Sequence, residues 1–283
     1  MTAFLGMGLL GSNWVRAMRK RGEEVHVWNR TASKATALEE IGAKAFATPA
    51  EAVKGTDRIH ICVSDDNAVN SILEQASQNL GKDAIIIDHT TTSTSGALER
   101  TEKWKKHGIT YIHAPVFMGP QNAHDSTGTM LISGDQEVVR VIEPELSKMC
   151  GNLMNLGPDP KEAAAYKLLG NHLFLSLTAG IADTFTLGKA MGLSRDDVSE
   201  FIDQMGSTPI KARVARILLG NYDEPTWELT MARKDARLMT EETERAGMTL
   251  DVMPTFGAHM DKLITEGFGA KDWSIVAKEA IEG

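Results

Sequence analysis

Three glycines near the start of the chain have the spacing of a dinucleotide-binding turn. They lie in the run Gly6-Met7-Gly8-Leu9-Leu10-Gly11. The run follows a predicted strand and opens a predicted helix, which is the context that this pattern requires. Glycine permits the tight turn, the close approach of the backbone to a pyrophosphate and close packing of helix on strand, and the helix amino end favours phosphate charge. We therefore expect all six residues to bind a dinucleotide cofactor.

The end of the second predicted strand bears on the type of cofactor. NAD enzymes usually place Asp or Glu here, where the carboxylate binds the ribose 2′-hydroxyl. This chain has Asn29, Arg30 and Thr31 instead. A carboxylate would repel a 2′-phosphate, whereas the Arg30 guanidinium can bind it through two hydrogen bonds and Thr31 can add a hydroxyl. The segment favours NADP(H) over NAD(H), and a solvated surface arginine is the alternative interpretation of Arg30.

Polar residues follow two further predicted strands. Val63, Ser64 and Asp65 stand at and after the end of one strand, and His89, Thr90 and Thr91 follow the next. Ligands of doubly wound sheets bind outside the carboxyl ends of the strands, so we expect Val63, Ser64, Asp65 and Thr91 to line the cofactor. Ordinary turn and cap chemistry explains any one of them equally well.

A lysine and an asparagine stand one helical turn apart in the middle of the chain. Lys167 and Asn171 share one face of a predicted helix because they are four residues apart. The surrounding residues are largely apolar, so the pair is expected either in a cleft or at the surface. On spacing alone, an exposed lysine is the more ordinary interpretation.

The elements that must position these residues alternate through the first half of the chain. We expect strands over 3–5, 24–28, 58–63, 84–88, 110–114, 129–133 and 152–156, and helices over 9–21, 33–41, 68–79, 96–107 and 137–149. Such alternation predicts an α/β Rossmann domain over residues 1–157, with a doubly wound, mostly parallel sheet.

The pattern changes after two prolines at Pro158 and Pro160. Beyond them we expect an all-α domain over residues 158–283, with helices over 161–191, 211–219, 226–246, 252–266 and 272–281. Ser194 is predicted to cap a further helix, which has Asp196 and Asp197 in its first turn.

Bulk properties exclude several classes of function. A formal net charge of −8 gives no electrostatic footprint for nucleic acid. No stretch approaches the ~18 apolar residues of a membrane span, and the amino end does not resemble a signal peptide. Cys62 and Cys150 form no CxxC pair, so we interpret both as thiols of a cytoplasmic protein. The eight histidines show no HxH or HExxH pattern, and we predict no metal site.

Several motifs together resemble the β-hydroxyacid dehydrogenase family, which includes 3-hydroxyisobutyrate dehydrogenases and glyoxylate/succinic semialdehyde reductases. The resemblance spans essentially the whole chain. It rests on the glycine turn, on the segment after the second strand and on four further motifs: His113 to Gly119, Lys167 with Asn171, Lys234-Asp235, and Asp272-Trp273-Ser274.

The resemblance implies an enzyme that interconverts a small carbonyl compound and a hydroxy compound. NADPH would deliver hydride to the carbonyl carbon, Lys167 would donate the proton to the forming alkoxide, and Asn171 would hold the lysine or the substrate oxygen. Lys234 would lie near the nicotinamide and the substrate carboxylate. The family also implies a homodimer or homotetramer that assembles through the second domain.

One segment departs from the family pattern. The family usually reads Asp-Ala-Pro-Val-Ser-Gly-Gly where this chain has His113-Ala114-Pro115-Val116-Phe117-Met118-Gly119. Phe117, Met118 and Gly119 are thus the expected substrate contacts, with more bulk and less polarity than usual. A larger or less polar carbonyl substrate is our hypothesis. Two alternatives stay open: an imine reductase, although such enzymes generally replace the catalytic lysine with Asp or Tyr, and a cofactor-binding scaffold without activity.

Overall fold

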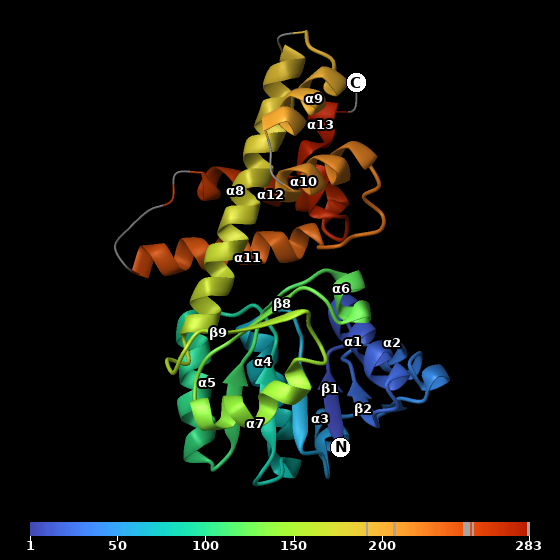
Figure 1. Ribbon diagram of the computed structural model, residues 1–283, viewed down its shortest axis with the longest axis vertical. Helices are drawn as coiled ribbons and strands as arrows, with labels where there is room; N and C mark the ends of the chain where they lie inside the picture. The colour runs from blue at the N-terminus through green and yellow to red at the C-terminus, as the bar shows by residue number, and fades with distance from the viewer. Residues whose placement is uncertain (191, 206–207, 246–249, 251, 282–283) are drawn as a thin grey trace. The chain divides into compact units, whose positions relative to one another are not determined.

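The computed structural model describes residues 1–190, 192–205, 208–245, 250 and 252–281 (Figure 1). The chain forms two compact units, Met1–Lys167 and Leu168–Gly283. The division falls within the long helix α8 (Glu162–Ala190), whose first turns pack with the first unit. No helix in the described part of the chain is both long enough and apolar enough to span a bilayer.

The first unit contains a parallel sheet, as the sequence predicts. The sheet has six strands, of which the short strand over Lys44–Ala45 was not expected from the sequence. Its strands are β1 (Thr2–Leu5), β2 (Val25–Trp28), β3 (Lys44–Ala45), β4 (Arg58–Ile61), β5 (Ile85–Asp88) and β6 (Thr110–His113). Their order in the sheet is β3-β2-β1-β4-β5-β6, and each neighbouring pair is parallel. This is the Rossmann order, in which the direction of winding reverses between β1 and β4.

Helices cover both faces of this sheet (Figure 1). Alternate residues of β1 face opposite ways: Phe4 packs in the core beneath α1 (Leu9–Lys20) and α7 (Gln136–Leu146). Ala3 and Leu5 pack beneath α3 (Pro49–Val53), α4 (Asp66–Ala76) and α5 (Thr94–Lys106). Because both faces are buried, the strands read as continuous apolar runs.

The strands expected over 129–133 and 152–156 form a separate sheet. It consists of β7 (Val116–Phe117), β8 (Thr129–Ile132) and β9 (Asn152–Asn155), in that order, with β7 antiparallel and β9 parallel to β8. The segment between β7 and β8 contains the short helix α6 (Pro120–Asp125), which is not among the helices expected from the sequence. Strand patterns predict that strands exist but not which strands pair, since pairing is set by long-range packing.

Two other local expectations are corrected. The helix expected over 33–41 is divided into α2 (Ala32–Thr36) and the 3₁₀ turn η1 (Glu39–Ile41), and this division lets Leu38 enter the core. Helix α3 was not expected from the sequence, although Thr48 and Glu51 have the types and spacing of a capping box. Thr48 accepts a hydrogen bond from the backbone N–H of Glu51, and the Glu51 carboxylate accepts one from the backbone N–H of Thr48.

The regular elements among the described residues of the second unit are helices, joined by turns and one isolated β-bridge between Glu228 and Asp272. It contains most of α8, then α9 (Arg195–Met205), α10 (Thr208–Leu219), α11 (Leu229–Arg245), α12 (Met253–Leu263), the π-helical turn η3 (Ile264–Phe268), the 3₁₀ turn η4 (Trp273–Ala277) and α13 (Lys278–Ile281). Ser194 caps α9 as predicted, because its hydroxyl accepts a hydrogen bond from the Asp197 N–H. The helix ends expected at Met191 and Ala246 lie outside the described residues.

A buried histidine pair joins β4, which contains His60, to the residue directly after β5, His89. His60 and His89 are 2% and 3% exposed, and their rings stack 5.2 Å apart, with His60 also stacked on Phe4. His89 Nδ1 donates to the Ala114 carbonyl at 2.7 Å, so its Nε2 accepts from His60 Nδ1 at 2.9 Å. Burial lowers the pKa of His89 from 6.5 to about 4 and lowers that of His60 well below 6.5.

This pair should make the fold sensitive to acid. Between pH 6.5 and 4 the unfolded chain binds protons that the folded chain does not, so stability falls as the pH is lowered through this range. His89 alone should cost about 2 kcal/mol by pH 5. Urea unfolding at pH 7.5 and pH 5 measures this loss. His89→Gln should reduce the difference, whereas His107→Gln, at an exposed site, should leave it unchanged; equal losses in both variants would contradict the prediction.

Candidate active site

The glycine turn has the geometry that a pyrophosphate requires. Gly6 has a φ of 108°, and a Cβ there would stand 2.1 Å from the Cys62 carbonyl oxygen; a Cβ on Gly11 would stand 2.0 Å from the Gly6 carbonyl oxygen. A Cβ on Gly8, by contrast, would meet nothing within 4 Å. The chain itself therefore needs the first and third glycines, while the second borders open space at the amino end of α1. The residues fit a dinucleotide phosphate.

The residues after β2 differ in their contacts. The Asn29 side-chain oxygen accepts a hydrogen bond from the Met7 N–H at 2.9 Å, and its amide donates to the Thr31 carbonyl at 2.9 Å. Asn29 thus fastens the glycine turn to the end of β2. Arg30 is exposed beside it, where a guanidinium can receive an anion without breaking an internal bond.

The residues after β4 are tied into the protein. The Val63 N–H donates to the Thr90 hydroxyl at 3.1 Å, so the segments after β4 and β5 are joined. The Ser64 hydroxyl donates to Asp65 at 2.9 Å, and Asp65 caps α4 by accepting from the Ala68 N–H at 2.9 Å. Thr91 lies half-buried in the next loop. Val63, Ser64 and Asp65 therefore have structural roles, and their expected contact with the cofactor stays a prediction.

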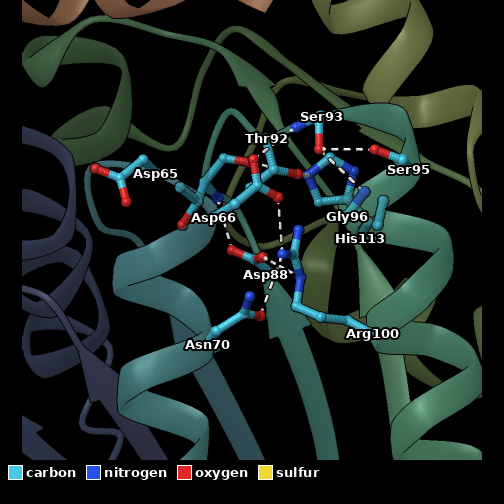
Figure 2. A network of polar contacts seen from close by, with 12 residues as sticks. Asp65, Asp66, Asn70, Asp88, Thr92, Ser93, Ser95, Gly96, Arg100 and His113 are labelled. Carbon is cyan, nitrogen blue, oxygen red and sulfur yellow. Dashed lines mark hydrogen bonds and ion pairs between the residues drawn. The ribbon is translucent and has the colours of Figure 1, made fainter.

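A buried charge network that the sequence analysis missed holds the β5–α5 loop, residues 89–93 (Figure 2). Asp88 accepts from the Thr90 N–H at 2.9 Å with one oxygen and from the Tyr111 hydroxyl at 2.6 Å with the other. Asp66 accepts from the Ser93 N–H at 3.0 Å and from Arg100 Nη1 at 2.8 Å. Both carboxylates therefore hold the loop backbone with one oxygen each.

Arg100 joins the two halves of this network. Its Nε donates to the Tyr111 hydroxyl at 2.8 Å, and its side chain is 3% exposed. Burial alone would lower the pKa of Arg100, but Tyr111, Asp88 and Asp66 raise it above its ordinary value, so the guanidinium stays charged. Burial has the opposite effect on Tyr111: it raises the pKa of the hydroxyl, which stays neutral and can donate its hydrogen.

The expected substrate segment is half-buried on β7 and at the start of α6. The Met118 side chain packs against the core of the first unit and beside Gly128. The Gly119 N–H donates to the Asn122 side-chain oxygen at 2.9 Å. In this conformation the Gly119 N–H is therefore not available to a substrate carboxylate. Asn122 was not singled out from the sequence, because only the fold of α6 turns its side chain back onto Gly119.

Lys167 lies against Phe117 within the first unit. Its ammonium nitrogen is 4.5 Å from the centre of the Phe117 ring, and both side chains are half-buried. The start of α8 is fixed nearby, because the Ala163 N–H donates to the buried Ser133 hydroxyl at 2.9 Å. The structure thus brings a predicted catalytic residue and a predicted substrate contact together.

The remaining predicted residues form a cluster in the second unit. Asn171 is 4% exposed and donates its amide to Asp235 at 2.5 Å. Lys234 forms an ion pair with the other Asp235 oxygen at 2.6 Å, and its side chain is 12% exposed. Asp235 therefore links Asn171 to Lys234. In the part of the chain that the structure describes, no group of three His, Cys, Asp or Glu side chains is arranged to hold a metal ion.

Comparisons with known proteins agree with this architecture. Residues 1–157 match the family model of the NAD binding domain of 6-phosphogluconate dehydrogenase, and residues 159–281 match that of the NADPH-dependent reductive aminase-like C-terminal domain. The uncharacterized oxidoreductase YfjR of Bacillus subtilis is 24% identical, over 98% of each chain.

Solved structures share the fold. Mycobacterium tuberculosis 3-hydroxyisobutyrate dehydrogenase, solved with L-serine, has a TM-score of 0.84 and 21% identity over 98% of each chain. The imine reductase of Myxococcus stipitatus, in complex with NADP⁺, has a TM-score of 0.65 and 21% identity over 98% of this chain and 99% of that one. The chain therefore belongs to the family of oxidoreductases that carry the NAD binding domain of 6-phosphogluconate dehydrogenase, as its resemblance to the β-hydroxyacid dehydrogenases indicates.

Proposed function

We propose that the chain is an NADPH-preferring reductase that interconverts a carbonyl compound and its hydroxy compound, with Lys167 as the proton donor. The observation that carries this proposal is the half-buried Lys167 ammonium against the predicted substrate contact Phe117, in the same unit as the cofactor turn. NADPH would supply hydride. The residues Gly6 to Gly11 would hold its pyrophosphate, and Asn29, Arg30 and Thr31 would hold its 2′-phosphate end.

The other residues have supporting roles in this proposal. Val63, Ser64, Asp65 and Thr91 would border the cofactor beside the glycine turn. Asn171 would hold the lysine or the substrate oxygen, and its bond to buried Asp235 fixes the orientation of its amide. Lys234 would contact the nicotinamide or an acidic group of the substrate.

The substrate that we infer is bulkier or less polar than a short hydroxy acid. Phe117 replaces a hydroxyl with an aromatic ring, and the Gly119 N–H is already bonded to Asn122. NADPH oxidation across aldehydes, 2-oxo acids, 3-oxo acids, ketones and cyclic imines tests this directly. The highest kcat/KM should fall on a bulky ketone or aldehyde, and a preference for glyoxylate would refute the substrate proposal.

The cofactor preference should depend on Arg30. Loss of a charge-assisted pair to a phosphate costs roughly 1.5–3 kcal/mol, so Arg30→Ala should raise the KM for NADPH by about 10–150-fold while the KM for NADH changes little. Arg21→Ala, another exposed arginine of the first unit, is the matched control. If both cofactors are affected equally, Arg30 does not read the 2′-phosphate.

Imine reduction is the second candidate, and it is favoured by the match of residues 159–281 to the reductive aminase-like model. A ketone and its matching cyclic imine, assayed with the same enzyme preparation, separate the two chemistries. A scaffold without activity would bind NADPH and reduce neither.

We also propose that the chain assembles with copies of itself through α8. Tyr166, Leu169 and Leu173 follow one another along this helix and are 50%, 64% and 58% exposed. Large apolar side chains exposed in a row are typical of an interface. Light scattering should give the mass of a dimer or tetramer rather than 30.8 kDa, and Leu169→Asp with Leu173→Asp should give the monomer.

A further inference from the structure

We propose that the Phe117 ring is a positioning residue for Lys167, holding its ammonium and stabilising the protonated form that reduction needs. This inference rests on the proposed function, in which Lys167 donates the proton. It assigns Phe117 a role that differs from a substrate contact. The family pattern has a serine here, so the role would be particular to chains with an aromatic side chain at this position.

The contact is close enough to be attractive. The Lys167 nitrogen is 4.5 Å from the Phe117 ring centre, within the roughly 6 Å over which an aromatic face attracts a cation. The negative face of the ring interacts with the charged ammonium and much less with the neutral amine. The ring therefore favours the charged state, and it does so without accepting the proton.

The surrounding structure keeps both partners in place. The Phe117 backbone pairs with Thr129 on β8, and β8 is followed directly by Ser133, whose hydroxyl holds the first turn of α8. The ring is thus held through β7, and the start of the helix that carries the lysine is held through Ser133, and both attach to β8. Half-burial of both side chains limits the water that would weaken the attraction.

The stabilised ammonium affects the pH range over which the enzyme can reduce its substrate. A lysine that stays protonated at neutral pH is ready to give its proton to the alkoxide oxygen as hydride reaches the carbonyl carbon. The new O–H bond forms as the N–H bond breaks, and the neutral amine recovers a proton from solvent. Oxidation of the hydroxy compound needs the neutral amine, so the ring would extend to higher pH the range in which the enzyme can reduce, without changing the equilibrium constant of the reaction.

The test compares Phe117→Leu with Phe117→Tyr. Leucine keeps an apolar side chain but has no aromatic face, whereas tyrosine keeps the face. The alkaline limb of kcat/KM for reduction reports loss of the protonated donor in the free enzyme. This limb should move down by roughly 0.4–1.5 pH units in Phe117→Leu and stay near the wild-type position in Phe117→Tyr. Circular dichroism and NADPH affinity show that each variant folds.

A second measurement does not depend on activity. Lysine labelled with ¹³C at Cε gives an NMR titration of Lys167, assigned by its absence in Lys167→Met, and its midpoint should move with the kinetic limb. The other titratable groups on the two helices are the same in every variant: Glu162, Tyr166, His172, Asp183 and Lys189 on α8, and His124 and Asp125 on α6.

The outcomes separate the two proposals. An unchanged or raised midpoint in Phe117→Leu, with Lys167→Met inactive, would overturn the role of Phe117 and leave the proposed function standing. Full activity in Lys167→Met would overturn the proposed function itself, and with it the catalytic meaning of the contact.

Discussion

Lys167→Met is expected to lower kcat for carbonyl reduction by about 10²–10⁴-fold, the contribution of a positioned general acid. Methionine keeps much of the length and apolar character of the lysine stem but can neither donate a proton nor stabilise an alkoxide. The glycine turn and Arg30 are untouched, so the affinity for NADPH should stay within about twofold. Stopped assays of product formation, with fluorescence titration of NADPH, measure the two effects separately.

The matched control for this variant is Lys161→Met. Lys161 lies directly before α8 and is exposed, with only a 3.5 Å ion pair to Asp159. Exposed pairs of this kind contribute about 0–1 kcal/mol, so its kcat should equal that of the wild type. If Lys167→Met loses less than tenfold in kcat, the proton comes from another group.

Arg100→Met is expected to lower the free energy of unfolding by about 3–5 kcal/mol, because it leaves the buried Asp88 carboxylate and the partly buried Asp66 carboxylate without their cation. Asp88 is fully buried and Arg100 nearly so. The midpoint of thermal unfolding should fall by roughly 6–20 °C for a domain of this size. Release of the β5–α5 loop should also weaken NADPH binding, measured on folded protein well below the midpoint.

A double variant and a surface variant test the cause of this loss. Arg100→Met with Asp88→Asn removes one of the stranded charges, so it should be more stable than Arg100→Met alone. Arg140→Met removes an exposed partner of Glu137 and should change stability by less than about 0.5 kcal/mol. If the double variant shows the full sum of the two single losses, the residues do not act as a network.

The sequence predicts those parts of the fold that depend on residues close together along the chain. The glycine turn, the buried strand at 84–88 and the Ser194 cap each depend on neighbours within a few residues, and all three are present. The long helix through Lys167 also follows from its own residues. The predicted roles of the site residues stay predictions until the variants are measured.

The parts that the sequence does not predict depend on partners far along the chain. Arg100 reads as an exposed helix residue until β5 and β6 bring Asp88 and Tyr111 to it. His60 lies within an apolar strand and His89 directly follows another, and only the fold shows that each supplies the other with a hydrogen-bond partner. The contact of Lys167 with Phe117 likewise needs the pairing of β7 with β8.

The three glycines of the turn should differ in how readily they are replaced during evolution. Gly6 and Gly11 are required by the backbone around them, because a Cβ would strike carbonyl oxygens at 2.1 and 2.0 Å. At Gly8 a Cβ would meet nothing within 4 Å, so we expect the bound cofactor, and not the fold, to select for glycine there. In descendants of such a chain that keep the fold but no longer bind the cofactor, the second glycine should be the first to be replaced, while the other two are kept. A glycine at this position would then indicate a descendant that still binds a nucleotide.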